Sequence, residues 1–187
     1  MVDFPRPSLR EVTAPPNVVT LLRIALVPVA LVLLACDRRM WALAALAIMF
    51  VSDGLDGYLA RRLDRVTELG KILDPAADKI AVVGVLLFLA FAGEFPFWAL
   101  LLIVVRDVAI VLGGSAIARK TGSVPPALMV GKIAVVVLGL VTIVYVADIK
   151  ALEPAALLLC VIAVAVSGLS YAVVAVRALS GPETTQE

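Results

Sequence analysis

The chain has 187 residues, of which 63% are apolar, and its 16 basic and 15 acidic residues give a formal net charge of +1. Soluble domains have about 45–50% apolar residues, and the mean hydropathy of this chain is +1.09. A soluble globular protein is therefore excluded. The small net charge identifies no partner, and we expect no nucleic-acid partner.

Six long apolar runs follow one another along the chain. They cover residues 18–36, 40–50 with a continuation into an acidic stretch, 80–92, 97–118, 128–147 and 151–176. A transmembrane helix needs about 20 apolar residues, and these runs lack the polar alternation of barrel strands. The sequence predicts an all-α integral membrane protein with six transmembrane helices, all in one domain over residues 17–179.

Polar segments flank this domain. Residues 1–16 form an N-terminal juxtamembrane segment in which Ser8 and Glu11 have the spacing of a capping box, ahead of Pro15 and Pro16. This pattern predicts one or two turns of interfacial helix, with a disordered tail as the alternative. The first apolar run is as long as a full span, so we do not expect a cleaved signal peptide. Residues 180–187 are a polar tail.

Basic residues near the helix ends predict the orientation in the membrane. With a cytoplasmic N-terminus, the larger group faces the cytoplasm and the smaller group faces the other side. The larger group is Arg6, Arg10, Arg61, Arg62, Arg65, Lys71, Arg119, Lys120 and Arg177, and the smaller is Arg38, Arg39 and Lys150. We therefore expect both termini and the acidic stretch on the cytoplasmic side of the cell inner membrane.

Four carboxylates gather in the acidic stretch that ends the second apolar run. Asp53 and Asp56 are three residues apart, and Asp74 and Asp78 are four apart, so each pair shares one face of a helix. The link over residues 62–69 would bring the pairs together. Asp74 followed by Pro75 also has the pattern of a helix start, and we expect the third helix to open there.

Facing carboxylates repel one another unless cations lie between them. Oxygen ligands favour Mg²⁺ or Mn²⁺, and the absence of histidine argues against zinc. Gly57 and Gly70 remove side chains beside the carboxylates, which leaves room for a bulky ligand; the alternative is close packing of helices. Arg61 shares a helix face with Gly57 and is suited to a phosphate or, alternatively, only to setting the topology.

These residues form the pattern Asp-x-x-Asp-Gly-x-x-Ala-Arg, eight residues, Gly-x-x-x-Asp-x-x-x-Asp. Its fixed positions are Asp53, Asp56, Gly57, Ala60, Arg61, Gly70, Asp74 and Asp78. The pattern resembles the signature of the CDP-alcohol phosphatidyltransferases. The resemblance extends to Asn17, Thr20 and Arg23 in the first span and to the six-helix plan, and the chain is similar to bacterial phosphatidylglycerophosphate synthases.

The resemblance implies a function and a site. It implies that the four aspartates hold two divalent metal ions and that Asp78 is the general base. It also implies a CDP-diacylglycerol substrate, whose nucleotide is surrounded by Asn17, Thr20, Gly57, Ala60, Arg61 and Gly70, and a homodimer in contact with membrane lipid. The expected reaction is transfer of a phosphatidyl group to a small polar alcohol with release of CMP.

The acceptor alcohol is expected to carry a phosphate. Arg106, Arg119 and Lys132 lie on the fourth and fifth spans and near their inner link, where a basic pocket would bind phosphate. Topology is the alternative role for Arg119, and Asp107 could compensate Arg106 structurally. Glycerol 3-phosphate is the expected acceptor, although Gly131-Lys132-Ile-Ala-Val departs from the Gly-Lys-x-Lys-Thr usual in phosphatidylglycerophosphate synthases. Phosphatidylglycerol, as in cardiolipin synthesis, and inositol phosphate are alternatives.

A divalent-cation transporter is the alternative from another functional class, because intramembrane acidic residues also mark ion pathways. The aspartates cluster at one membrane face, and the later apolar runs hold no matching acidic group. The sequence therefore favours the enzyme.

Overall fold

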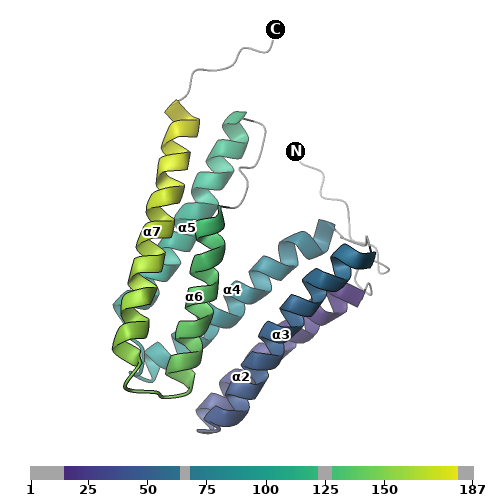
Figure 1. Ribbon diagram of the computed structural model, residues 1–187, viewed down its shortest axis with the longest axis vertical. Helices are drawn as coiled ribbons and strands as arrows, with labels where there is room; N and C mark the ends of the chain where they lie inside the picture. Colours follow the sequence, from purple (N-terminus) through teal and green to yellow (C-terminus); the bar gives the residue numbers. More distant parts are fainter. Residues whose placement is uncertain (1–14, 64–67, 122–127, 181–187) are drawn as a thin grey trace. The chain divides into compact units, whose positions relative to one another are not determined.

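A computed structural model describes the backbone of residues 15–63, 68–121 and 128–180, and the side chains of residues 24–52, 79–120 and 128–180 except residue 179. Over these residues the chain forms helices and no strand (Figure 1). The helices are α2 (Pro15–Ala35), α3 (Arg39–Leu63), α4 (Glu68–Phe91), α5 (Phe97–Thr121), α6 (Met129–Val146) and α7 (Glu153–Ser180). The prediction of an all-α protein is confirmed for the described residues.

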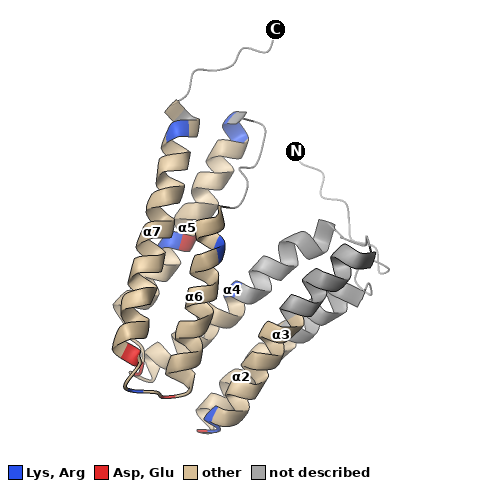
Figure 2. Ribbon diagram, viewed as in Figure 1, with Lys and Arg blue, Asp and Glu red and all other residues tan. Residues whose placement is uncertain are grey.

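Three helices have the length and apolar composition of membrane spans within the described residues. They are Phe97–Lys120 in α5, Met129–Val146 in α6 and Glu153–Ala178 in α7. Figure 2 shows that charges on these three helices lie mainly near the ends, apart from one adjacent basic and acidic pair inside α5. The protein is therefore a membrane protein.

The first three helices carry shorter apolar stretches in their described portions, at Ile24–Ala35, Arg39–Ser52 and Lys79–Phe91. The helices themselves have 21, 25 and 24 residues. At 1.5 Å per residue each is long enough to cross about 30 Å of hydrocarbon. That α2, α3 and α4 also cross the membrane, which would give six transmembrane helices, stays a prediction.

The chain divides into two compact parts, residues 1–89 and 90–187. In the first part, α2 packs against α3. Ala30 of α2 and Ala42 of α3 have no solvent exposure, and small residues of this kind allow membrane helices to approach closely. A Cβ built on Gly84 of α4 would lie 3.8 Å from Val27 Cγ1 of α2, which is ordinary contact.

In the second part, α7 packs against both α5 and α6 (Figure 1). Ile103 of α5, Val141 of α6 and Val164 of α7 are almost fully buried. Phe95, in the turn before α5, stacks edge-on against Tyr145 near the end of α6, with ring centroids 4.9 Å apart. The Phe95–Tyr145 contact links the turn before α5 to α6 at the end away from the α5–α6 link.

Three short turns each end a helix with a residue of positive φ: Asp37 at 55°, Gly93 at 77° and Asp148 at 56°. After α2, the Arg38 N–H bonds the Leu33 carbonyl and the Asp37 N–H bonds that of Leu34. This is the Schellman arrangement. The same arrangement follows α6, where the Ile149 N–H bonds the Val144 carbonyl and the Asp148 N–H bonds that of Tyr145.

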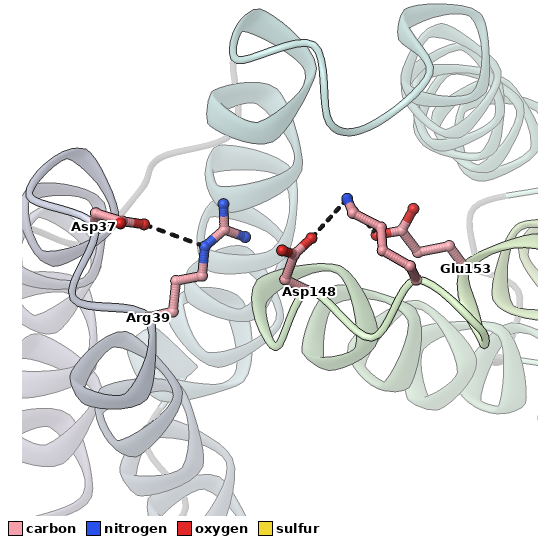
Figure 3. Close-up of polar contacts among 5 residues, drawn as sticks. Asp37, Arg39, Asp148 and Glu153 are labelled. Atoms are coloured by element: carbon pink, nitrogen blue, oxygen red, sulfur yellow. Dashed lines mark hydrogen bonds and ion pairs between the residues drawn. The ribbon is translucent and has the colours of Figure 1, made fainter.

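Ion pairs surround the two turns that contain aspartate (Figure 3). Asp37 Oδ1 lies 3.4 Å from Arg39 Nε, and Asp148 Oδ1 lies 2.6 Å from Lys150 Nζ. Lys150 also contacts Glu153 Oε1 at 3.0 Å. Aspartate tolerates the left-handed conformation, so each turn combines a helix stop with a local charge pair.

One predicted helix start was wrong. The third span was expected to open around Asp74, but α4 begins at Glu68. Glu68, Leu69, Lys71 and Leu73 are good helix formers, and despite Gly70 they extend the helix ahead of the Asp-Pro signal. Pro15 and Pro16 begin α2, where the first helical turn accommodates proline. The predicted interfacial helix within residues 1–14 lies outside the described residues.

Candidate active site

The four aspartates of the motif lie on consecutive helices, Asp53 and Asp56 on α3 and Asp74 and Asp78 on α4. Because both segments are helical, the spacings of three and four residues keep each pair on one helical face. The side chains of all four lie outside the described residues. Their assignment as metal ligands, and that of Asp78 as base, therefore stays a prediction.

The two pairs occupy similar positions relative to the link between their helices. Asp56 and Asp53 lie 7 and 10 residues before the end of α3 at Leu63, and Asp74 and Asp78 lie 6 and 10 residues after the start of α4. The four predicted donors are carboxylates, as hard divalent cations prefer. This donor set fits Mg²⁺ or Mn²⁺.

The six residues expected around the nucleotide are also on helices. Asn17 and Thr20 lie in the first two turns of α2, and Gly70 lies in the first turn of α4. Gly57, Ala60 and Arg61 lie in the last two turns of α3. Their side chains are outside the described residues, and their contact with CDP stays a prediction.

Arg106 is a buried charge in the middle of α5 and only 7% exposed. Its Nη1 lies 2.6 Å from Asp107 Oδ1, and its Nη2 donates a hydrogen bond to Ser167 Oγ of α7. The predicted compensation by Asp107 is confirmed. The ion pair and the hydroxyl offset the high cost of placing a guanidinium inside a membrane protein.

One nitrogen of the Arg106 guanidinium makes no hydrogen bond among the described residues. Its Nε is buried and has no hydrogen-bond partner among the described residues. A buried donor without an acceptor costs about 1–3 kcal/mol, so an anionic or carbonyl oxygen placed there would be favourable. The orphan donor makes Arg106 suitable for a ligand in addition to its structural partners.

A cavity of about 660 Å³ lies between α5 and α7, with Arg106 among its lining residues. Small residues create the space, among them Gly113, Gly114 and Gly168. The other polar side chains of the lining are Ser115 and Tyr171. The cavity therefore suits a ligand that has an apolar portion and a few polar groups.

Arg119 and Lys132 differ from Arg106 in their surroundings. Both are exposed, and neither lines the cavity between α5 and α7. Arg119 lies in the last turn of α5, whereas Lys132 lies in the first turns of α6. Of the three basic residues predicted to bind the acceptor, only Arg106 is placed in this cavity.

The sequence analysis missed Tyr171 and the hydrogen bond of Ser167. Ser167 is fully buried against Arg106, and the Tyr171 hydroxyl accepts a hydrogen bond from the Leu128 N–H at 3.2 Å. Ser167, Gly168, Ser170 and Tyr171 interrupt the apolar run of α7. Polar residues within a membrane span are a signal of interhelical contacts, and this one could have been used.

Comparison with known proteins adds to this geometry. A family model described as CDP-alcohol phosphatidyltransferase matches residues 13–176. A protein of Streptomyces coelicolor named cardiolipin synthase (CMP-forming) is 38% identical over 117 residues, which cover 59% of this chain and 54% of the relative. A Bacillus subtilis protein named CDP-diacylglycerol–glycerol-3-phosphate 3-phosphatidyltransferase is 37% identical over 133 residues, covering 63% and 68%. The chain thus spans about half the length of the first relative and two thirds of the second.

Proposed function

The chain belongs to the CDP-alcohol phosphatidyltransferase family, and from this membership we propose that it transfers a phosphatidyl group from CDP-diacylglycerol to an alcohol and releases CMP. The observation that carries the proposal is the family match over residues 13–176, which contains all eight motif positions. The enzyme would serve phospholipid biosynthesis in the cell inner membrane. We place both termini and the active site on the cytoplasmic side, and we propose a homodimer.

The chemistry assigned to the chain is positioning and proton transfer. Asp53, Asp56, Asp74 and Asp78 would hold two Mg²⁺ or Mn²⁺ ions, which would neutralise the pyrophosphate charge and lower the pKa of the acceptor hydroxyl. Asp78 accepts the hydroxyl proton. The acceptor oxygen forms a bond to the lipid-linked phosphorus while the bond from that phosphorus to the CMP oxygen breaks.

Other residues would hold the two substrates. Asn17, Thr20, Gly57, Ala60, Arg61 and Gly70 are proposed to surround the CDP group. Arg106, Arg119 and Lys132 are proposed to bind the phosphate of the acceptor. The unpartnered Nε of Arg106 supports the inclusion of this residue, because a phosphate oxygen would satisfy it.

Glycerol 3-phosphate is the proposed acceptor, in agreement with the name of the Bacillus subtilis relative. Phosphatidylglycerol is a second candidate, which the cavity beside Arg106 favours. The lining of this cavity is apolar apart from Arg106, Ser115 and Tyr171. A lipid acceptor could bury an acyl portion there and present its phosphate to Arg106.

The test is an assay of the purified protein with CDP-diacylglycerol, Mg²⁺ or Mn²⁺, and three acceptors. Release of CMP with glycerol 3-phosphate, together with the matching lipid product, is expected. Activity with phosphatidylglycerol or inositol phosphate alone would change the acceptor and keep the reaction. Absence of CMP with every acceptor would reject the proposed function, and a divalent-cation flux would then favour the transporter.

Chelation tests the metal proposal in the same assay. Excess chelator should abolish CMP release, and Mg²⁺ or Mn²⁺ should restore it, because four facing carboxylates repel one another without cations. Asp53→Asn, Asp56→Asn and Asp74→Asn should each lose most activity. Full turnover in chelator would rule out the two-metal site.

A further inference from the structure

The first turn of α6 lacks the usual side-chain cap. The N-cap residue Leu128 has an extended backbone, with φ −70° and ψ 141°, and makes no side-chain cap hydrogen bond. The amides of Gly131 and Lys132 both bond the Leu128 carbonyl, at 3.0 Å and 3.3 Å. A residue of α7 provides the missing contact to the Leu128 amide, since the Tyr171 hydroxyl accepts the Leu128 N–H at 3.2 Å.

The Tyr171 hydroxyl accepts the hydrogen bond that, in a capping box, a side chain of the same helix would accept. In a capping box, the third helical residue reaches back to the N–H of the N-cap residue. With Leu128 as N-cap, that third residue is Gly131, which has no side chain. A Cβ built on Gly131 would lie 2.8 Å from Tyr171 Oη and 3.1 Å from Tyr171 Cε2. The glycine therefore leaves space for the phenol of another helix.

Lys132 follows Gly131 directly. It lies one residue beyond the capped turn, and its side chain is exposed. The direction of a side chain in the first turns of a helix depends on where those turns begin and how they pack. The N-cap amide of Leu128 donates a hydrogen bond to Tyr171 of α7, and the buried Gly131 lets the phenol lie against the first turn of α6. Both contacts constrain where this turn lies relative to α7.

We propose that Tyr171 is a positioning residue for the acceptor: by capping α6 through the space that Gly131 leaves, it sets the position of Lys132. This inference rests on the proposed function, in which Lys132 binds the acceptor phosphate. Tyr171 acts on the acceptor through Lys132 and is assigned no contact with the reacting atoms. The pair also gives the Gly131-Lys132 sequence a physical role, because a Cβ at residue 131 would force the phenol of Tyr171 to move.

Steady-state kinetics of Tyr171→Phe test the proposal, with Tyr145→Phe as the matched control. Tyr145 lies at the other end of α6, where its hydroxyl donates a hydrogen bond to the Glu153 carbonyl at 3.5 Å. Loss of one hydrogen bond should raise the KM of Tyr171→Phe for the acceptor about two- to tenfold, with the KM for CDP-diacylglycerol unchanged. Gly131→Ala should raise the acceptor KM at least as much, and Tyr145→Phe should change neither value.

A double-mutant cycle decides whether the effect passes through Lys132. In a Lys132→Gln background, Tyr171→Phe should have no further effect on the acceptor KM. Additive effects, an unchanged KM in Tyr171→Phe, or an equal rise in Tyr145→Phe would overturn the proposal.

Hydrogen exchange separates this proposal from the proposed function. In Tyr171→Phe the amides of residues 128–132 should exchange faster than in the wild type, whatever the enzyme's activity. Unchanged exchange would overturn the cap itself. Absence of CMP release by the wild type, which is measured before any variant is compared, would overturn the proposed function and with it the role of Lys132.

Discussion

Replacing Arg106 tests whether its burial serves stability, acceptor binding or both. In Arg106→Met, Asp107 loses an ion pair of 2.6 Å while its side chain stays only 16% exposed. Removing one partner of a buried pair costs about 3–5 kcal/mol. We expect about 3 kcal/mol, the low end of that range, because the remaining exposure of Asp107 gives it some access to polar surroundings.

The free energy of unfolding of the purified protein in micelles measures this loss. The double variant Arg106→Met/Asp107→Asn should recover most of the stability, because it removes both charges of the ion pair. Lys132→Gln is the control, since an exposed substitution should change the stability by less than about 0.5 kcal/mol. An Arg106→Met protein as stable as the wild type would refute the reasoning from the buried ion pair.

Kinetics of the same double variant separate the two roles of Arg106. A charge-assisted hydrogen bond to phosphate contributes about 1.5–3 kcal/mol, so its loss should raise the acceptor KM roughly ten- to a hundredfold. If Arg106 binds the acceptor, the double variant is stable but keeps this high KM. A double variant with a wild-type KM would return Arg106 to a purely structural role.

Asp78→Asn should lower kcat by about 10²–10⁴-fold, as expected for loss of a general base, while CDP-diacylglycerol still binds; weaker substrate binding as the sole defect would make Asp78 only a metal ligand. Gly93→Ala should lower the unfolding free energy by about 1 kcal/mol, because φ is +77°. The cost is backbone strain alone, since no atom lies within 4 Å of the new Cβ. An unchanged unfolding midpoint would contradict the positive φ at this turn. The pKa of Lys150 is raised above its ordinary 10.5 chiefly by its hydrogen bond to Asp148. A group whose pKa is higher in the folded state stabilises that state fully below its unfolded-state pKa, and this contribution is lost as the pH rises through its folded-state pKa. The stability difference between wild type and Lys150→Gln should therefore be constant near neutral pH and shrink above pH 10.5, and a difference that varied around pH 7 would contradict this assignment.

The sequence by itself determined the helical class, the helix order and the family motif. Apolar runs of spanning length have no other solution in a membrane than helices or barrels, so α5, α6 and α7 start and end close to the predicted runs. The short turns were predictable for a similar reason, since charged and glycine residues interrupt the runs there. The eight motif positions were found from residue types and spacings that resemble the family signature, and these are local properties of the chain.

Local signals failed where neighbouring segments competed. The Asp-Pro pair at residues 74 and 75 has a helix-start signal, yet α4 begins at Glu68. Helix propensity summed over the preceding residues outweighed one capping pattern. In contrast, the ion pair of Arg106 with Asp107 was predictable, because the two residues are adjacent in the sequence.

Only the tertiary structure decided which distant residues meet. Ser167 reaches Arg106 across 61 residues of sequence, and Tyr171 caps Leu128 across 43. Neither contact could be predicted from a spacing in the sequence, because contacts between helices depend on how α5, α6 and α7 pack. The space at Gly131 is likewise defined by α7, so the sequence shows the glycine and only the packing shows what it accommodates.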